Sequence, residues 1–219
     1  MGVVMADVVL YGMAFSSYVR TARLALAEKG VDYVLEPVEL GSEAHGALHP
    51  FRKMPAFRHG PVHLFETFAI TRYVDEAFAG PPLQPAEAAD RAVMTQWIGA
   101  ICDYGYTALV RDYLFLYLFA TMRGTEPDRS AIDAAVPKMQ ATLLTFERLL
   151  PPGSPTLVGG DTPTLADFFL LPILHYLRRT PESASHLASL PGLSAWFDGI
   201  AARQSAIDTL PPPPPGPKG

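Results

Sequence analysis

The chain has 219 residues, of which 49% are hydrophobic and 18% are charged, and its formal net charge is −5. A chain of this length buries roughly 70% of the surface that its unfolded form exposes, so a core can form without a disulfide or a metal. Nucleic-acid binding requires a cluster of basic side chains on one face, and a net charge of −5 argues against such a cluster. We therefore expect no nucleic-acid partner.

The cysteine count and the distribution of apolar residues bear on where the protein works. Cys102 is the only cysteine, so no disulfide can form within the chain and a reducing compartment is favoured. The first ten residues, MGVVMADVVL, lack the basic residues that precede the apolar part of a signal peptide. No stretch reaches about 18 uninterrupted apolar residues. We expect a cytoplasmic protein that does not enter a membrane.

Strand and helix signals alternate over residues 1–80. Short β-branched or alternating runs predict strands at 7–12 and 31–40 and a hairpin over 54–65. Helices are expected at 17–29, where Gly30 provides the stop, and from Glu66 to about Phe78, while 42–51 is a turn or short helix. The order β-α-β-α-β-β-α describes a small mixed sheet with helices on both faces.

A proline-rich joint at 79–90 separates this α/β half from an all-helical half. Helices are predicted at 86–120 (one helix or a broken pair), 130–150, 164–179 and 192–204. Thr164 and Asp167 match a capping box. We expect domains at 1–80 and 91–205, a linker at 81–90, and a mobile proline-rich tail at 206–219.

Three separated features of the first half carry groups suited to a zwitterionic, peptide-sized ligand. Ser16 and Ser17 stand at the start of the first helix, KMPAF (53–57) opens a strand with a proline, and Glu66 and Thr67 open the last helix of this half. In a small sheet of this topology all three are expected at one end. There, helix N-terminal N–H groups bind a carboxylate, Glu66 binds an ammonium group, and the extended segment pairs with a peptide bond.

Each feature also has a purely structural interpretation. Ser16 or Ser17 can cap the helix, Glu66 and Thr67 suit a first helical turn, and a proline at position 55 suits an edge strand. The six histidines are scattered without a metal-ligand spacing, so we expect no metal site.

Four stretches, in the same order, resemble the cytosolic glutathione transferases: LYG…SSYVR…ALAEKGVDY, HPFRKMPAF, LFETFAITRYV and PTLADFFLLPILHYL. They cover about 1–80 and 155–200. The sequence is most similar to the serine-type phi class, with the zeta and theta classes next. This resemblance implies a thioredoxin-like N-terminal domain that binds glutathione, followed by an all-helical domain that contributes the electrophile site.

The resemblance also implies roles for individual residues. Ser16, four positions before Arg20, is the catalytic hydroxyl in a phi-like register, whereas a theta-like register selects Ser17. The residues implied in binding glutathione are Lys53 and His45 at the glycyl carboxylate, Met54 through its backbone before a cis Pro55, and Glu66 and Thr67 at the γ-glutamyl end.

A serine hydroxyl is sufficient for the implied chemistry. A free thiol of pKa about 8.5 is only ~3% thiolate at pH 7, and the thiolate is the nucleophile. Lowering that pKa by ~2 units takes about 2.7 kcal/mol of preferential stabilisation. A hydrogen bond to a charged group contributes ~1.5–3 kcal/mol and a helix N-terminus roughly 0.3–1 kcal/mol. The serine therefore acts as a donor and need not lose its proton.

The co-substrate site is expected to be apolar and aromatic. The stretch YGYTALVRDYLFLYLF (104–119) contains aromatic rings with polar tips. The candidates for lining the site are Met13, Phe15, Tyr106, Tyr113 and Tyr117. Ordinary core packing is an equally open interpretation of the tyrosines.

The implied function is that of a homodimeric detoxification enzyme. It would add the glutathione thiolate, as co-substrate, to an apolar electrophile or use it to reduce a peroxide. One alternative is a glutathione-dependent isomerase of the zeta type, which Tyr18 disfavours because it stands where a Ser-Ser-Cys motif has its cysteine. The other is a non-enzymatic interaction module. Phe51 is a candidate dimer anchor, or it packs under its own loop.

Overall fold

The computed structural model describes residues 7–213 and 216. The chain forms two compact units: the chain up to Gln84 together with Gln204–Pro212, and Pro85–Arg203. The first is an α/β unit and the second is all-helical. Within the described residues, no helix combines the length and apolarity that crossing a bilayer requires.

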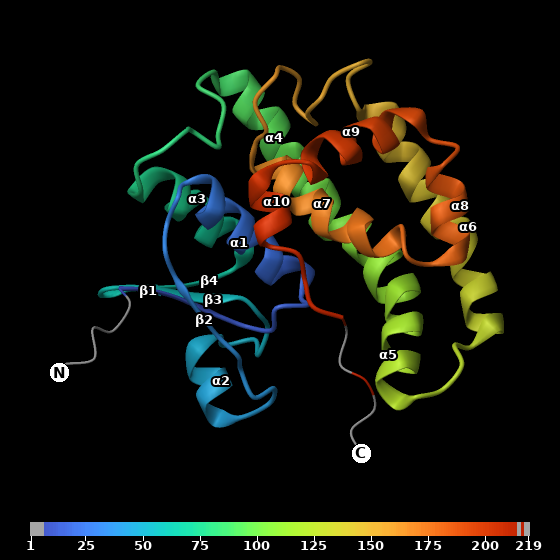
Figure 1. Cartoon of the computed structure of the whole chain (residues 1–219), viewed down its shortest axis with the longest axis horizontal. Helices are drawn as coiled ribbons and strands as arrows, with labels where there is room; N and C mark the ends of the chain where they lie inside the picture. The colour runs from blue at the N-terminus through green and yellow to red at the C-terminus, as the bar shows by residue number, and fades with distance from the viewer. Residues whose placement is uncertain (1–6, 214–215, 217–219) are drawn as a thin grey trace. The chain divides into compact units, whose positions relative to one another are not determined.

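A four-stranded mixed sheet forms the centre of the first unit. Its strands are β1 (Val8–Tyr11), β2 (Val34–Glu36), β3 (Ala56–His59) and β4 (Val62–Phe65), in the spatial order β2-β1-β3-β4. β2 runs parallel to β1, and β3 is antiparallel to both β1 and β4. Helices α1 (Ser17–Glu28) and α3 (Thr67–Ala77) cover one face and α2 (Glu43–Leu48) the other (Figure 1). The predicted mixed sheet with helices on both faces is confirmed.

The first helix follows its sequence pattern closely. Val19, Ala22 and Leu26, the predicted buried face of α1, are all fully buried. Gly30 has φ +64°, a conformation that glycine adopts without a Cβ penalty, and its N–H donates to the Ala27 carbonyl at 3.0 Å. The predicted stop at Gly30 is therefore confirmed.

The second strand is shorter than the sequence indicates. The alternation over 31–40 predicts about ten residues of strand, whereas β2 covers only Val34–Glu36. Among the described strands, β2 lies at the edge of the sheet and pairs only with β1, and Val34 is 42% exposed. Pro37, which follows β2, has no N–H to continue the ladder.

A buried ion pair ties the end of α1 to α3 and to the chain that follows α3. Lys29 Nζ lies 3.2 Å from Asp75 Oδ1 and donates to the Pro81 carbonyl at 3.1 Å. Asp75 also accepts from the Leu83 N–H at 2.8 Å and from the Gln84 amide at 3.0 Å. Burying two charges is favourable only when such additional bonds satisfy them. These contacts fix the first residues of the predicted linker within the first unit.

The segment predicted to be a mobile tail from position 206 begins with ordered structure. Helix α10 (Gln204–Asp208) packs on α1, and the Arg20 guanidinium donates to the Ala206 carbonyl at 3.1 Å. Arg23 donates to the Thr209 carbonyl at 3.2 Å. These two cations hold the chain in place as far as Thr209, which is buried. Residues 211–213 have no regular structure, and 214–215 and 217–219 of the predicted tail lie outside the described residues.

The second unit is built entirely from helices. They are α4 (Ala88–Ala100), η1 (Ile101–Leu114), α5 (Phe115–Arg123), α6 (Arg129–Leu149), α7 (Leu165–Leu177), α8 (Pro181–Leu187) and α9 (Pro191–Ala201). The helical run predicted at 86–120 is continuous, but its middle, η1, has the wider π-helical winding. The short α8 was not predicted, although Thr180, Pro181 and Glu182 form a helix-start signal.

Helix α7 is buried on nearly all sides, and its predicted capping box is confirmed. The fully buried Asp167 carboxylate accepts from the Thr164 N–H at 2.7 Å, the Leu157 N–H at 2.8 Å and Trp196 Nε1 at 2.8 Å. Burial raises the pKa of Asp167, and these hydrogen bonds oppose that rise. The carboxylate thus joins the start of α7, the loop before it and α9.

Candidate active site

The strand register brings the three sequence features to one end of the sheet. Tyr11, the last residue of β1, pairs with Ala56, the first residue of β3. Ala56 in turn pairs with Phe65, the last residue of β4. The chain segments attached to this row are the serine-bearing loop after β1, the loop that precedes β3, and the turn that leads into α3. Their convergence follows directly from the pairing of three strands.

Ser16 is the N-cap of α1. Its backbone is extended (φ −68°, ψ 130°), and its Oγ accepts from the Val19 N–H at 3.4 Å. A hydroxyl that accepts through its oxygen still carries a hydrogen to donate. The capping role and a donor role toward a ligand are therefore compatible at Ser16. Ser17 is the first residue inside the helix.

Gly12 allows the loop after β1 to pass close to its neighbours. It has φ +152°, and a Cβ at this position would lie 2.5 Å from Cγ2 of Val19 and 3.3 Å from Cβ of Met54. The Met13 N–H that follows donates to Sδ of Met54 at 3.4 Å. The serine-bearing loop and the loop before β3 are thus in direct contact.

The loop before β3 contains a cis peptide bond between Met54 and Pro55. Lys53, just before it, is exposed, whereas Pro55 is buried. The Lys53 carbonyl lies 2.9 Å from Nε2 of His45. Because the Gly41 N–H donates to Nδ1 of His45 at 3.3 Å, the ring proton is on Nε2, which donates to Lys53.

This geometry changes the expected role of His45. Its side chain is 2% exposed, and both ring nitrogens are engaged by the protein's own backbone. The ring therefore holds the loop at Lys53 in place, in contrast to the expectation that His45 contacts the glycyl carboxylate directly. His45 lies inside α2, in the connection between β2 and β3.

Glu66 adopts a strained backbone at the start of α3. Its φ of +70° is unusual for a residue with a side chain, and it costs about 1–3 kcal/mol. Glu66 accepts the Ile70 N–H through its carbonyl at 3.0 Å, but its carboxylate makes no capping bond with the helix. Thr67 is buried at the first helical position. An exposed carboxylate beside a helix N-terminus can bind a cation while the helix N–H groups bind an anion.

The candidate electrophile residues belong to both units. Met13 and Phe15 lie in the loop before α1 and are half-buried. Tyr106 is half-buried in η1, and Tyr117 is half-buried in α5. Tyr113 is fully buried in η1. Its ring lies in the core of the helical unit, so the packing interpretation applies to Tyr113.

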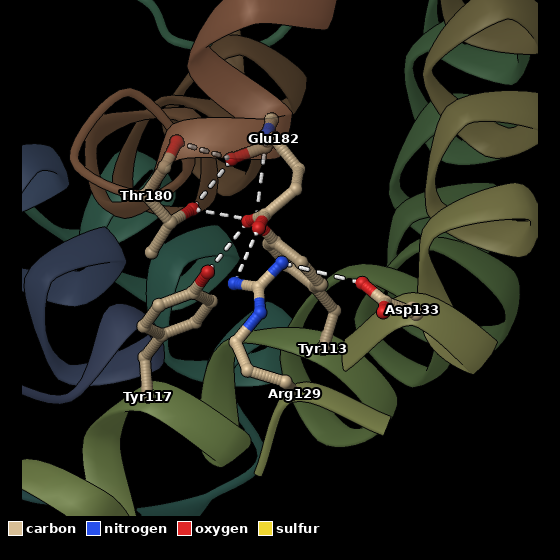
Figure 2. A network of polar contacts seen from close by, with 7 residues as sticks. Tyr113, Tyr117, Arg129, Asp133, Thr180 and Glu182 are labelled. Carbon is tan, nitrogen blue, oxygen red and sulfur yellow. Dashed lines mark hydrogen bonds and ion pairs between the residues drawn. The ribbon is translucent and has the colours of Figure 1, made fainter. Parts of the chain in front are cut away.

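A carboxylate that sequence reasoning missed holds two of these tyrosines. Figure 2 shows Glu182, at the start of α8, between Tyr113, Tyr117 and Arg129. Its Oε2 lies 2.9 Å from the Tyr113 hydroxyl and 2.5 Å from the Tyr117 hydroxyl, and its Oε1 lies 2.7 Å from Arg129 Nη1. The Tyr113 hydroxyl also lies 3.0 Å from Oγ1 of Thr180. This Glu182 network joins η1, α5, α6 and α8.

The Glu182 network shifts the pKa values of Glu182 and Tyr117. Burial opposes ionisation of Glu182, but hydrogen bonds from Tyr117 and Arg129 outweigh it and lower the pKa of Glu182 to about 2. Burial and the bond to Glu182 raise the pKa of Tyr117. Tyr117 therefore stays protonated and directs its hydrogen at Glu182 rather than at a ligand. Among the described residues, no group of three or more His, Cys, Asp or Glu side chains forms a metal site.

Comparison with known proteins identifies the family. Family models for the glutathione S-transferase N-terminal and C-terminal domains match residues 10–82 and 100–204. Glutathione S-transferase 3 of Zea mays is 33% identical over 96% of this chain and 98% of its own length. Glutathione S-transferase F9 of Arabidopsis thaliana is 31% identical over 92% of this chain and 95% of its own.

Solved structures give the same result. The apo form of glutathione S-transferase III has a TM-score of 0.79 at 33% identity, covering 95% of this chain and 100% of that one. Glutathione S-transferase I from maize in complex with an atrazine glutathione conjugate has a TM-score of 0.80 at 29% identity, covering 93% and 96%. The chain therefore belongs to the glutathione S-transferase family, and its relatives are plant transferases of the phi class.

Proposed function

We propose that this enzyme adds the thiolate of glutathione to apolar electrophiles in cytoplasmic detoxification, with Ser16 as the activating donor. The observation that carries the proposal is the pairing row Tyr11–Ala56–Phe65, from which all three candidate ligand-binding segments extend. The relative from maize that was solved with an atrazine glutathione conjugate supports conjugation as the reaction type.

Binding of glutathione would use charges at opposite ends of the ligand. Glu66 would bind the γ-glutamyl ammonium, and Thr67 with the first N–H groups of α3 would bind its carboxylate. Lys53 would bind the glycyl carboxylate, and the Met54 backbone would pair with the cysteinyl group. His45 would act from behind the loop, through its bond to the Lys53 carbonyl.

Thiolate formation would depend on the start of α1. The Ser16 hydroxyl would donate to the thiolate sulfur while its oxygen caps the Val19 N–H. The positive end of the α1 dipole adds to this stabilisation. Met13, Phe15, Tyr106 and Tyr117 remain the candidates for the electrophile site, with Tyr117 contributing its ring because its hydroxyl is bound to Glu182.

A homodimer is the assembly that we propose for this enzyme. Phe51 is 70% exposed, although its ring meets those of His49 and Phe65 edge-on, at 6.3 Å between centroids in both cases. A large exposed aromatic side chain next to the binding loop is suited to cover by a second copy of this chain.

An activity panel tests the proposed reaction. Purified protein with glutathione is assayed against a halogenated nitrobenzene, an organic hydroperoxide, an isothiocyanate and maleylacetoacetate. We expect turnover of the halogenated aromatic that falls strongly in Ser16→Ala. Turnover of maleylacetoacetate alone would indicate the isomerase instead. Glutathione binding by calorimetry without turnover of any substrate would indicate the non-enzymatic module.

A further inference from the structure

His49 lies between the two halves of the candidate glutathione site. It follows α2 and begins the loop that leads to the cis peptide bond. Its N–H donates to the His45 carbonyl at 2.9 Å, and its carbonyl accepts the Arg52 N–H at 2.8 Å. With the backbone held on both sides and the side chain 2% exposed, the imidazole has a fixed position.

The imidazole of His49 packs against the strand that carries the Glu66 turn. Its ring centroid lies 5.0 Å from that of Phe65, with 47° between the planes. Phe65 ends β4 and directly precedes Glu66. The His49 ring therefore bridges the loop that bears Lys53 and the turn that bears Glu66.

The Nδ1 atom of His49 is buried and, among the described residues, has no hydrogen-bond partner. Buried polar atoms are nearly always paired, and an apolar ring would fill this space without leaving one unpaired. An imidazole with one unpaired, buried nitrogen at the junction of two candidate binding segments points to a role for its ionisation.

The charged and titratable groups that act on His49 come from each element around it. Glu66 acts from the β4–α3 turn, His45 from α2, and Lys53 from the loop. Burial lowers the pKa of His49, the Glu66 carboxylate opposes this, and His45 and Lys53 add to it. The guanidinium of Arg52, in the same loop, is bound to the Gly41 carbonyl at 3.2 Å. His49 is thus neutral at pH 7, and Glu66 is the charge that acts on it most strongly.

We propose that His49 is a positioning residue whose neutral form supports the Glu66 turn, so that a proton on His49 opposes glutathione binding. The inference rests on the proposed function, in which Glu66 binds the γ-glutamyl ammonium. When that ammonium binds, it offsets the carboxylate charge that favours protonated His49. The two carboxylates of glutathione act in the opposite direction. The glycyl carboxylate would bind at Lys53, which influences His49 less than Glu66 does, and the γ-glutamyl carboxylate would be compensated by Thr67 and the first N–H groups of α3. By linkage, glutathione affinity falls as His49 gains its proton.

The test measures binding of S-methylglutathione, which has no ionisable thiol, by calorimetry from pH 7.5 to pH 5.0. We expect the wild-type affinity to fall about three- to tenfold more than that of His49→Gln over this range, since one unit of pKa shift corresponds to a tenfold change. The control is His63→Gln, which removes an exposed imidazole from β4, the strand that contains Phe65. This variant should follow the wild-type profile.

A second readout is the NMR titration of the histidine ring protons, with the His49 signal identified by its absence in His49→Gln. We expect its pKa to lie below 6.5 in the unliganded protein and to fall further with S-methylglutathione bound. Identical pH profiles in wild type and His49→Gln, or a His49 pKa that does not fall on binding, would overturn the inference. Wild-type protein that binds no S-methylglutathione at pH 7.5 overturns the proposed function as well. If His49→Gln does not fold, the wild-type titration decides, with its signals assigned from substitutions of the other histidines.

Discussion

The backbone N–H of Met13 donates to the sulfur of Met54 at 3.4 Å, which joins the loop bearing Ser16 to the loop bearing Pro55. A thioether sulfur is a weak acceptor, so the contact fixes the spacing of the two loops more than it stabilises the fold. The close approach depends on Gly12, because any Cβ there would meet Val19 and Met54.

Gly12→Ala is expected to destabilise the protein and to weaken glutathione binding together. The added methyl group would lie 2.5 Å from Cγ2 of Val19 in a backbone conformation that alanine rarely adopts. Overpacking of this kind costs roughly 1–3 kcal/mol. Urea unfolding and calorimetry with glutathione measure the two effects. The control is Gly99→Ala in α4, where nothing lies within 4 Å of the new Cβ and stability should be equal or higher.

Glu66 is expected to lower the stability of the fold through its strained backbone while its carboxylate increases glutathione affinity. Glu66→Ala and Glu66→Gly should both lower glutathione affinity about 10- to 150-fold, because a charged hydrogen bond is worth ~1.5–3 kcal/mol. Only glycine relieves the strain at φ +70°, so Glu66→Gly should be roughly 1 kcal/mol more stable to urea than Glu66→Ala. Wild-type affinity in both variants would show that Glu66 does not contact the ligand.

Much of this arrangement can be predicted from local sequence signals. Gly30 ends a helix because it adopts φ +64°, and Asp167 marks the start of another because its carboxylate reaches the Thr164 N–H at 2.7 Å. These are interactions between residues close in sequence. The hairpin turning at 59–61 and the helix beginning near Glu66 were predictable for the same reason.

The features that sequence analysis missed depend on partners far along the chain. Tyr113 meets Glu182 from 69 positions away, so its pattern alone cannot separate a ligand-facing ring from a buried one. The family resemblance assigned His45 to the glycyl carboxylate. Its bonds to Gly41 and Lys53 depend on how the loop folds back, which the sequence does not show. The π-helical winding of η1 was not predicted from the sequence.

The Glu182 network predicts a specific dependence of stability on pH. The pKa of Glu182 is about 2 in the folded protein, against 4.5 for an ordinary glutamate. A carboxyl group whose pKa is lowered by folding stabilises the folded protein at pH values above its pKa in the unfolded state. This stabilisation is lost as the pH falls toward 2. Between pH 5 and pH 2 the wild type should lose on the order of 2–3 kcal/mol more unfolding free energy than Glu182→Gln.

Urea unfolding across this pH range checks the prediction. The matched control is Asp133→Asn. This change removes the other carboxylate that pairs with Arg129, and the Asp133 side chain is 69% exposed. An exposed pair contributes about 0–1 kcal/mol, so the control should keep the wild-type slope. Equal slopes in wild type and Glu182→Gln would contradict the assigned role of the network.

Phe51→Ala is expected to weaken the proposed homodimer. An aromatic anchor that is buried by a partner contributes on the order of 2 kcal/mol or more to association. Sedimentation at low micromolar concentration should show more monomer in Phe51→Ala than in wild type. Because Lys53 lies in the same loop as Phe51, glutathione affinity should fall together with the stability of the dimer. Tyr104→Ala, which removes an aromatic ring that is 73% exposed in the other unit, serves as the comparison. An intact dimer in Phe51→Ala would exclude Phe51 as the anchor.

The most direct measurement is the thiol pKa of bound glutathione, followed by thiolate absorbance against pH. We predict a wild-type value about 2 units below that of free glutathione, a value near the free one in Ser16→Ala, and little loss of affinity. Ser16→Asp separates the two roles of this position, because it keeps a capping oxygen for Val19 but has no hydroxyl to donate. An unshifted thiol pKa in the wild type, or a shift that survives Ser16→Ala and disappears in Ser17→Ala, would contradict the assignment of Ser16.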